Sequence, residues 1–422
     1  MNKQKQIEEE VLKIGIKAKE ASLRISLLSS KKKNDILLDA ADNIKKNKKL
    51  IIERNSIDIE ENKKDLNSSL LDRLMLDSNR IDSICKGLVE ISKLDDPIGK
   101  ILGEWKRPNG LKIQKVSIPL GVIGVIYESR PNVAADAAGL CLKSGNPLIL
   151  RGGSESYHSS SKIVEIINQS LRKFQLPEGT LQNIPTKDRL AVGALIKMDK
   201  YVDVIIPRGG RSLIERVSDE SRVHVFKHLD GICHTYIHKS ADKEISKNVT
   251  LNAKMRRPGI CGATETILCD KEVVKTHLPE LIKSLLNSGC EVRGDKFVKE
   301  VNSIVIKAEK EDWRTEYLDK IVSIKTVNNG VDEAVDHINH YGSGHTDAII
   351  SDDEKATEFF LNNVDSGIVM HNTSTQFADG GEFGMGAEIG ISTSKVHARG
   401  PVGVAQLTSF KYKVRGKGQV RP

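Results

Sequence analysis

Apolar residues recur at three- and four-residue steps through the first part of the chain. Ile7, Val11 and Ile14 follow this spacing, which predicts an amphipathic helix. The pattern continues to about residue 95, and Ser29-Ser30 supplies a start for a second helical run. We therefore expect residues 2–95 to form successive helices that carry little chemistry.

The pattern changes near residue 111, where strand-like and helix-like runs begin to alternate. A parallel sheet needs such alternation, because each strand is joined to the next by a crossover helix. The predicted strands and helices are Leu111–Val116, Gly121–Tyr127, the helix Val133–Lys143, Leu148–Leu150, Val202–Ile206 and a helix from Ser212. The sequence thus predicts an α/β domain with a parallel sheet over residues 120–235.

A second α/β set is predicted after residue 261. Its strand candidates are Thr264–Cys269, Ser303–Ile306, Ile321–Ile324, Asp347–Ile350 and Gly367–Met370. The glycine-rich stretch Asp379–Gly390 is predicted to be a long loop. The last segment, Thr408–Val414, is predicted to be an exposed strand that seeks a partner chain.

Composition narrows the function classes. The 422 residues are 29% charged and 38% apolar, and the net charge is +8. The basic residues form no single arm, and the tail Lys411–Arg421 lacks the interleaved aromatics of a single-strand binder. The charge instead favours anionic substrates and cofactors.

The cysteine pattern and the lack of long apolar runs indicate the cellular compartment of the protein. The six cysteines show neither paired nor Cys/His metal spacing, and no apolar run approaches the roughly 20 residues of a membrane span. We expect a protein of the reducing cytoplasm with no metal, no membrane contact and no nucleic-acid partner.

Cys261 has a setting suited to a nucleophile. It lies between a helical and a strand-like run, after Arg256, Arg257, Pro258 and Gly259. Nearby cations or a helix N-terminus lower a thiol pKa, and the thiolate is the reactive form. The alternative is a small buried hydrophobe, the role we assign to the other cysteines: Cys85, Cys141, Cys233, Cys269 and Cys290.

Two strands end in Arg-Gly-Gly before a helix, at Arg151-Gly152-Gly153 and at Arg208-Gly209-Gly210. Backbone N–H groups in such turns can approach a phosphate, and arginine can add bidentate contacts. Neither is a full dinucleotide fingerprint, so plain turns remain the alternative.

Two further segments allow both a structural and a functional interpretation. Asn132, after Glu128-Ser-Arg-Pro131, suits either a helix cap or an amide that donates to an oxyanion. Phe377–Gly390 suits either a surface loop or a loop that folds over a small polar substrate.

These motifs together resemble the gamma-glutamyl phosphate reductase branch of the aldehyde dehydrogenase superfamily. The resemblance runs from about Ile118 to the C-terminus. It is carried by Ile118-Pro-Leu-Gly-Val-Ile-Gly-Val-Ile-Tyr-Glu-Ser-Arg-Pro-Asn132, Leu150-Arg-Gly-Gly-Ser-Glu-Ser156, Pro207-Arg-Gly-Gly-Arg-Ser212, His228-Leu-Asp-Gly-Ile-Cys-His234, Arg257-Pro-Gly-Ile-Cys-Gly262 and Phe377–Lys395.

The resemblance implies a role for each matching residue. Cys261 would be the nucleophile, and Asn132 the oxyanion amide paired with the Cys261 backbone N–H. NADPH is implied as cofactor, because Arg151 stands where many relatives carry a lysine and would suit a 2′-phosphate. The implied cofactor-binding residues are Arg151, Gly152, Gly153, Ser154, Pro207, Arg208, Gly209 and Gly210, and the implied substrate-binding residues are Arg130, Arg257, Phe377 and Glu388.

One departure from the superfamily concerns the glutamate that activates water against the thioester in hydrolytic members. The matching place reads His228-Leu-Asp-Gly231. The implied reaction is the reduction of L-glutamyl 5-phosphate to L-glutamate 5-semialdehyde and phosphate through a cysteine thioester, the second step of proline biosynthesis. His228, Asp230 and Glu265 remain alternative bases.

The implied architecture is aldehyde dehydrogenase-like α/β, with three parts. Residues 1–235 would bind NADPH and carry a strand extension near 106–120, residues 236–395 would form the catalytic domain, and 396–422 a C-terminal return with an oligomerisation strand. A homo-oligomer and a glutamate 5-kinase partner are further expectations. The rival functions are an NAD-dependent aldehyde dehydrogenase that hydrolyses its thioester and a basic nucleic-acid-binding protein.

Overall fold

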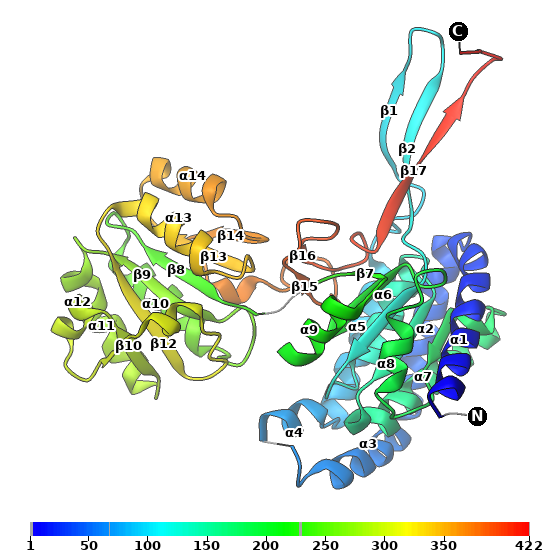
Figure 1. The fold of residues 1–422 in the computed structure, drawn as a ribbon, viewed down its shortest axis with the longest axis horizontal. Helices are drawn as coiled ribbons and strands as arrows, with labels where there is room; N and C mark the ends of the chain where they lie inside the picture. Colours follow the sequence, from blue (N-terminus) through cyan, green and yellow to red (C-terminus); the bar gives the residue numbers. More distant parts are fainter. Residues whose placement is uncertain (1–2, 67, 228–229, 422) are drawn as a thin grey trace. The chain divides into compact units, whose positions relative to one another are not determined.

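The computed structural model describes residues 3–66, 68–227 and 230–421, which divide into two compact units (Figure 1). Unit 1 comprises Met1–Lys227, Gly384–Gly390 and Val402–Pro422, and unit 2 comprises His228–Phe383 and Ile391–Pro401. These bounds differ from the predicted 1–235, 236–395 and 396–422, because the chain returns to unit 1 twice and to unit 2 once near its C-terminal end.

Unit 1 begins with helices, as the hydrophobic spacing predicts. The side chain of Ser29 accepts a hydrogen bond from the backbone N–H of Lys32, which confirms the predicted helix start. The helices are α1 (Lys3–Ser26), α2 (Ser30–Lys46), α3 (Lys48–Asn62), α4 (Ser68–Leu74) and α5 (Ser78–Lys93). No helix among the described residues is long and apolar enough to cross a membrane.

The centre of unit 1 is a five-stranded parallel sheet in the order β5-β4-β3-β6-β7. The strands are β3 (Ile123–Tyr127), β4 (Leu148–Gly152), β5 (Leu181–Asn183), β6 (Val204–Arg208) and β7 (His224–Val225). The helices between them are α6 (Val133–Lys143), α7 (Tyr157–Lys173), α8 (Leu190–Leu195) and α9 (Arg211–Glu220), with the short 3₁₀ turns η1 (Ser154–Ser156) and η2 (Glu178–Thr180). The predicted parallel sheet over 120–235 is confirmed up to β7.

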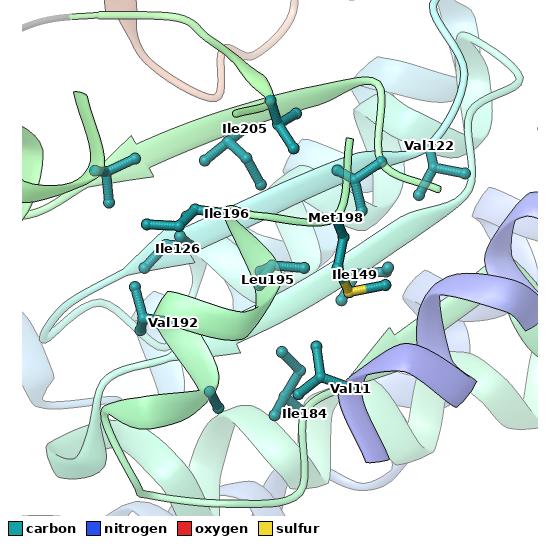
Figure 2. Packing of buried hydrophobic residues seen from close by; sticks show 14 of the residues in the cluster. Val11, Val122, Ile126, Ile149, Ile184, Val192, Leu195, Ile196, Met198 and Ile205 are labelled. Carbon is teal, nitrogen blue, oxygen red and sulfur yellow. The ribbon is translucent and has the colours of Figure 1, made fainter. Parts of the chain in front are cut away.

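One face of this sheet packs on α8 and α1 (Figure 2). Ile126, Ile149 and Ile205 of three adjacent strands meet Leu195 and Val11 in one buried cluster. Burying such side chains contributes about 1.5–3 kcal/mol each. The core therefore holds the strand ends that carry both Arg-Gly-Gly turns.

A separate three-stranded antiparallel sheet also belongs to unit 1. It has the order β1-β2-β17, with strands β1 (Ile101–Lys106), β2 (Lys112–Pro119) and β17 (Thr408–Arg415). Thr408 pairs with Pro119 and Arg415 with Lys112. The predicted combination of residues near 106–120 with the C-terminal segment is confirmed, and β17 pairs with a strand of its own chain on one side.

Unit 2 is built on a seven-stranded parallel sheet in the order β11-β10-β12-β9-β8-β13-β14. The strands are β8 (Cys233–Ile237), β9 (Thr264–Asp270), β10 (Glu291–Gly294), β11 (Ile306–Lys307), β12 (Ile321–Val327), β13 (Thr346–Ile350) and β14 (Ile368–His371). The helices are α10 (Lys243–Met255), α11 (Val274–Asn287), α12 (Lys296–Val301), α13 (Gly330–Tyr341) and α14 (Glu354–Asn363), with the 3₁₀ turns η3 (Lys310–Arg314) and η4 (Thr375–Phe377). The short strands β15 (Ile391–Ser392) and β16 (Gly400–Pro401) pair antiparallel.

Two sequence predictions need correction here. The predicted strand Ser303–Ile306 is mostly a turn, and only Ile306 belongs to a strand. The sequence predicts that Cys233 belongs to the first domain, but β8, which begins at Cys233, pairs with β9 and β13 in the second sheet.

Candidate active site

Cys261 lies on the turn between α10 and β9, as the sequence predicts. Among the six cysteines, all within the described residues, it alone is partly exposed while the other five are buried. Burial raises the pKa of Cys141, Cys233 and Cys269 above the usual thiol range, and that of Cys290 to about 11. Cys261 is therefore the cysteine best placed to meet a substrate.

The backbone of Cys261 is held by the loop that leads into β8. The thiol of Cys233 donates to the Cys261 carbonyl oxygen at 3.1 Å. A methyl group on Gly231 would lie 2.6 Å from the Cys261 Cα, so only glycine permits this close approach. Within the described part of the chain, no group accepts a hydrogen bond from the Cys261 N–H. That N–H is available to an oxyanion.

Gln376 connects the glycine-rich tail to the segment before the nucleophile. Its buried amide donates to the carbonyl oxygens of Ala253 at 2.9 Å and Arg257 at 3.3 Å. Its oxygen accepts from the guanidinium of Arg256 at 3.4 Å. Both arginines are exposed. Sequence reasoning missed Gln376, although its position beside Phe377 was a usable signal.

The three alternative bases differ in their surroundings. Glu265 is fully buried and pairs with fully buried Lys254, with 2.5 Å between Oε2 and Nζ. Burial raises the Glu265 pKa to about 7, against the lowering effect of Lys254. A fully enclosed carboxylate suits a structural pair better than a base that reaches substrate. Asp230 is partly exposed, and His228 lies outside the described residues.

A different glutamate reaches the loop beside the nucleophile. Glu316, between η3 and β12, accepts a hydrogen bond from the Gly231 N–H at 2.8 Å. Burial raises the pKa of Glu316 above its usual value. The two residues are 85 positions apart, so local sequence gave no signal for this contact.

In unit 1, both Arg-Gly-Gly turns lie at the carboxyl end of the sheet, on either side of β3. Tyr127 pairs with Gly152 of β4 and with Arg208 of β6. Ligands of open α/β sheets bind outside the carboxyl ends of the strands. The predicted cofactor residues, Arg151 to Ser154 and Pro207 to Gly210, are thus brought together around one strand end.

Two carboxylates cross-link these turns. Glu128, directly after β3, accepts from the Gly210 N–H at 2.9 Å. Glu155 accepts from the N–H of Ser129 at 2.6 Å, and Ser129 has a φ of 47°. A phosphate at Gly210 would therefore have to compete with Glu128 for that N–H.

The two arginines differ in their surroundings. Arg151 is 5% exposed and donates to the carbonyl oxygens of Lys187 at 3.0 Å and Asp188 at 3.3 Å. Arg208 packs on Gly390, where a methyl group would lie 2.9 Å from Nη1. Within the described residues the Nε atoms of both arginines are buried without a hydrogen-bond partner. Two buried, unpaired N–H donors beside this strand end suit an anionic cofactor such as a phosphate-bearing dinucleotide.

Asn132 stands at the start of α6 but does not cap it through its side chain. Its amide nitrogen donates instead to the Asp136 carboxylate at 2.9 Å. Asn132 thus occupies the predicted cap position of α6 and accepts through its backbone carbonyl from the Asp136 N–H at 3.1 Å, while its side chain makes no capping hydrogen bond. Burial raises the pKa of Asp136 to about 6.

The predicted substrate residues are divided between the units. Arg130 and Glu388 belong to unit 1, and Arg257 and Phe377 to unit 2. The Phe377 side chain is 48% exposed. Within the glycine-rich stretch, Asp379 accepts from the N–H groups of Gly381 at 2.8 Å and Glu382 at 3.3 Å, which shapes its first turn.

Comparison with known proteins defines the class. Residues 2–301 match the model of the aldehyde dehydrogenase family. The chain is 55% identical over 410 residues to a gamma-glutamyl phosphate reductase of Paramagnetospirillum magneticum, covering 97% of each sequence. It is 52% identical over 419 residues to the protein of the same name from Brucella suis, covering 99% of each. The chain therefore belongs to the aldehyde dehydrogenase family and is an oxidoreductase.

Solved structures agree with this assignment. The crystal structure of gamma-glutamyl phosphate reductase from Thermotoga maritima matches with a TM-score of 0.95 at 40% identity, covering 98% of this chain and 100% of that one. An acetylating aldehyde dehydrogenase from Geobacillus thermoglucosidasius matches with a TM-score of 0.69 at 17% identity, covering 99% of each chain, and shows the shared fold. The resemblance drawn from the motifs and the predicted fold class are both confirmed.

Proposed function

We propose that this chain reduces L-glutamyl 5-phosphate to L-glutamate 5-semialdehyde and phosphate, with NADPH as cofactor, as the second step of proline biosynthesis. The observation that carries the proposal is Cys261, the partly exposed thiol on the α10–β9 turn, set in a chain that is 52–55% identical to four proteins named gamma-glutamyl phosphate reductase.

The chemistry assigned to Cys261 is nucleophilic. Its thiolate attacks the acyl carbon, the bond from that carbon to the phosphate oxygen breaks, and phosphate leaves while a thioester forms. NADPH, when bound, supplies the hydride that reduces the acyl carbon. The carbon–sulfur bond then breaks, which releases the aldehyde and restores the thiolate.

The oxyanion of both tetrahedral species needs hydrogen-bond donors. We assign this role to the Cys261 backbone N–H and to the Asn132 amide. Support comes from the N–H of Cys261, which lacks an acceptor within the described residues, and from the helix-start position of Asn132. Each such donor contributes about 3–4 kcal/mol to lowering the barrier.

Cofactor binding is assigned to Arg151, Gly152, Gly153 and Ser154 together with the range 207–210. The buried, unpaired Nε atoms of Arg151 and Arg208 support an anionic ligand there. A guanidinium beside the ribose would suit the additional phosphate of NADPH. Two solved structures of the same fold contain bound NADP, an engineered glycolyl-CoA reductase and a glyceraldehyde-3-phosphate dehydrogenase from Methanocaldococcus jannaschii.

Substrate binding is assigned to Arg130, Arg257, Phe377 and Glu388. The substrate carries an ammonium, a carboxylate and a phosphate, so both acidic and basic side chains are required. A reductase has no use for a water-activating glutamate at 228–231, because hydride transfer must precede hydrolysis. This favours the reductase over a hydrolytic dehydrogenase.

Location and partners complete the proposal. Six free cysteines suit a reducing compartment, and we place the enzyme in the cytoplasm as a homo-oligomer. Because the acyl phosphate is unstable in water, a glutamate 5-kinase is the partner that would deliver it.

The test is the reverse reaction, in which glutamate semialdehyde and phosphate reduce NADP⁺. We expect wild-type activity that requires phosphate, and a loss of at least about 10⁴-fold in Cys261→Ala. The matched control is Cys85→Ala, a buried cysteine of α5 that should leave the rate unchanged. Activity in Cys261→Ala, or reduction without phosphate, would overturn the proposal.

A single turnover in the forward direction separates reduction from hydrolysis. Mixing enzyme with the acyl phosphate in the absence of NADPH should give phosphate and a stable thioester. Rapid release of glutamate under these conditions would identify a hydrolytic dehydrogenase instead.

A further inference from the structure

Asp136 is a partly buried acid on an otherwise apolar helix, and nothing in the proposed reaction uses it. It lies in the first turn of α6, where Ala134, Ala135 and Ala137 are fully buried. One carboxylate oxygen accepts from the Asn132 amide at 2.9 Å, and the other lies 3.9 Å from where a methyl group on Gly87 of α5 would be. Within the described residues, Asn132 is the one side chain that donates to this carboxylate.

A carboxylate in such a setting costs free energy. Burial raises its pKa to about 6, which shows that the ionised form is disfavoured relative to water. Stability alone would favour an apolar residue between α5 and α6. An apolar residue would lose the hydrogen bond to Asn132 and the charge attraction of Arg208, both of which lower the Asp136 pKa. Of these two interactions, the hydrogen bond is the one that acts on the Asn132 amide.

That hydrogen bond determines which way the Asn132 amide points. A side-chain amide has a donor end and an acceptor end of nearly equal shape, so packing alone does not distinguish them. An ionised carboxylate only accepts, and it therefore selects the orientation in which the –NH₂ group faces Asp136. The second N–H of that group then has a fixed direction, which an oxyanion donor needs.

We propose that Asp136 is a positioning residue that holds the Asn132 amide in its donating orientation for the reaction. This rests on the proposed function, in which Asn132 donates to the oxyanion. Asp136 acts through Asn132 and does not itself touch the substrate.

The alternative is a purely structural acid, since a negative charge in the first turn stabilises a helix through its dipole. A structural role predicts a lower unfolding temperature in Asp136→Ala with kcat unchanged. The matched control for the dipole effect is Asp332→Ala, which removes an exposed first-turn acid from α13.

The test is a double-mutant cycle on the steady-state reverse reaction. Asn132→Ala should lower kcat by about 10²–10³-fold. Asp136→Ala should lower kcat by about 10- to 100-fold with little change in KM. In the Asn132→Ala background, Asp136→Ala should have no further effect, because the amide that it orients is absent.

Asp136→Asn gives a second variant of nearly the same shape. Its oxygen can accept from Asn132, but its own –NH₂ can also donate to the Asn132 oxygen, so both orientations become populated. We expect a kcat between those of wild type and Asp136→Ala. If Asp136→Ala fails to fold, the cycle is run with Asp136→Asn.

The outcomes separate this inference from the proposed function. Normal kcat in Asp136→Ala together with an impaired Asn132→Ala would overturn the positioning role and leave the proposed reaction intact. Losses that multiply in the double variant would also overturn it, since they show independent effects. A fully active Asn132→Ala would remove the oxyanion role of Asn132 itself, and with it the basis of the inference.

Discussion

Gly231 contacts the backbone of Cys261 so closely that one added methyl group would displace the nucleophile. A methyl group there would lie 2.2 Å from the Cys261 carbonyl oxygen and 2.6 Å from its Cα, closer than any non-bonded approach. Backbone atoms cannot rotate away as the end of a flexible side chain can. We predict that Gly231→Ala lowers kcat by about 100-fold, because the sulfur moves relative to the acyl carbon.

Gly259 provides the matched control on the same stretch of unit 2. Its added methyl group would lie 3.6 Å from the nearest atom, the carbonyl oxygen of Leu318, which is an ordinary contact. Gly259→Ala should therefore keep a kcat near that of wild type. The prediction is tested by the steady-state kcat of both variants, with circular dichroism to verify that each is folded. Equal kcat values would show that the close approach of Gly231 does not position the Cys261 backbone.

At the scale of elements, the nucleophile turn is anchored by the ion pair between Lys254 of α10 and Glu265 of β9. Both side chains are fully buried, so removing one partner leaves the other charge uncompensated. We predict that Lys254→Met destabilises the fold by about 3–5 kcal/mol at alkaline pH, where Glu265 is ionised. Lys254→Met combined with Glu265→Leu should recover most of that loss, as measured by urea unfolding.

The same pair makes the effect of Lys254→Met depend on pH. In the wild type the folded-state pKa of Glu265, about 7, exceeds its ordinary value of 4.5, so folding favours the protonated acid below pH 7. Without Lys254 that pKa rises further. Stability lost in the variant should therefore grow as pH rises above 7, by at most about 1.4 kcal/mol per pH unit. A loss that is constant between pH 6 and pH 9 would contradict the assignment.

Elements with a strong local pattern were predicted well, and those that depend on distant partners were not. The helix Val133–Lys143 has its predicted bounds because Pro131 and Asn132 precede its first residue and Ser144-Gly145 follow its last. The strand β10 (Glu291–Gly294) is not predicted by the sequence, because it is short and charged. It forms by pairing with β12.

The candidate site follows the same division. Cys261 and the two Arg-Gly-Gly turns carry local signals, so sequence placed them on the turns where they lie. Glu316, Gln376 and Asp136 act through contacts with other residues, two of them more than 80 positions apart in sequence. Glu316 has no local signal. Gln376 could be found only through its position beside Phe377, and Asp136 only through its four-residue spacing from Asn132.

At the scale of the whole molecule, the C-terminal strand β17 completes the antiparallel sheet that β1 and β2 begin much earlier in the sequence. β17 pairs along its length with β2, and its other edge is open within the described residues. Phe410, Tyr412 and Val414 alternate along it and are 44%, 56% and 55% exposed. Lys115 lies 3.8 Å above the Phe410 ring, and Trp105 packs edge-on against Tyr412. An open edge bearing exposed apolar side chains is a surface that proteins normally cover.

We expect the proposed homo-oligomer to form through this strand. We predict that deleting residues 408–422 lowers the assembly mass measured by light scattering, while deleting only 416–422, which leaves β17 whole, does not. If the longer deletion prevents folding, Phe410→Lys with Val414→Lys places two charges on the same face and should also dissociate the assembly. An unchanged mass in a folded β17 variant would contradict this. The deletion removes both the backbone edge and the apolar side chains of an interface at β17, and the substitutions place two charges where the apolar contacts would form.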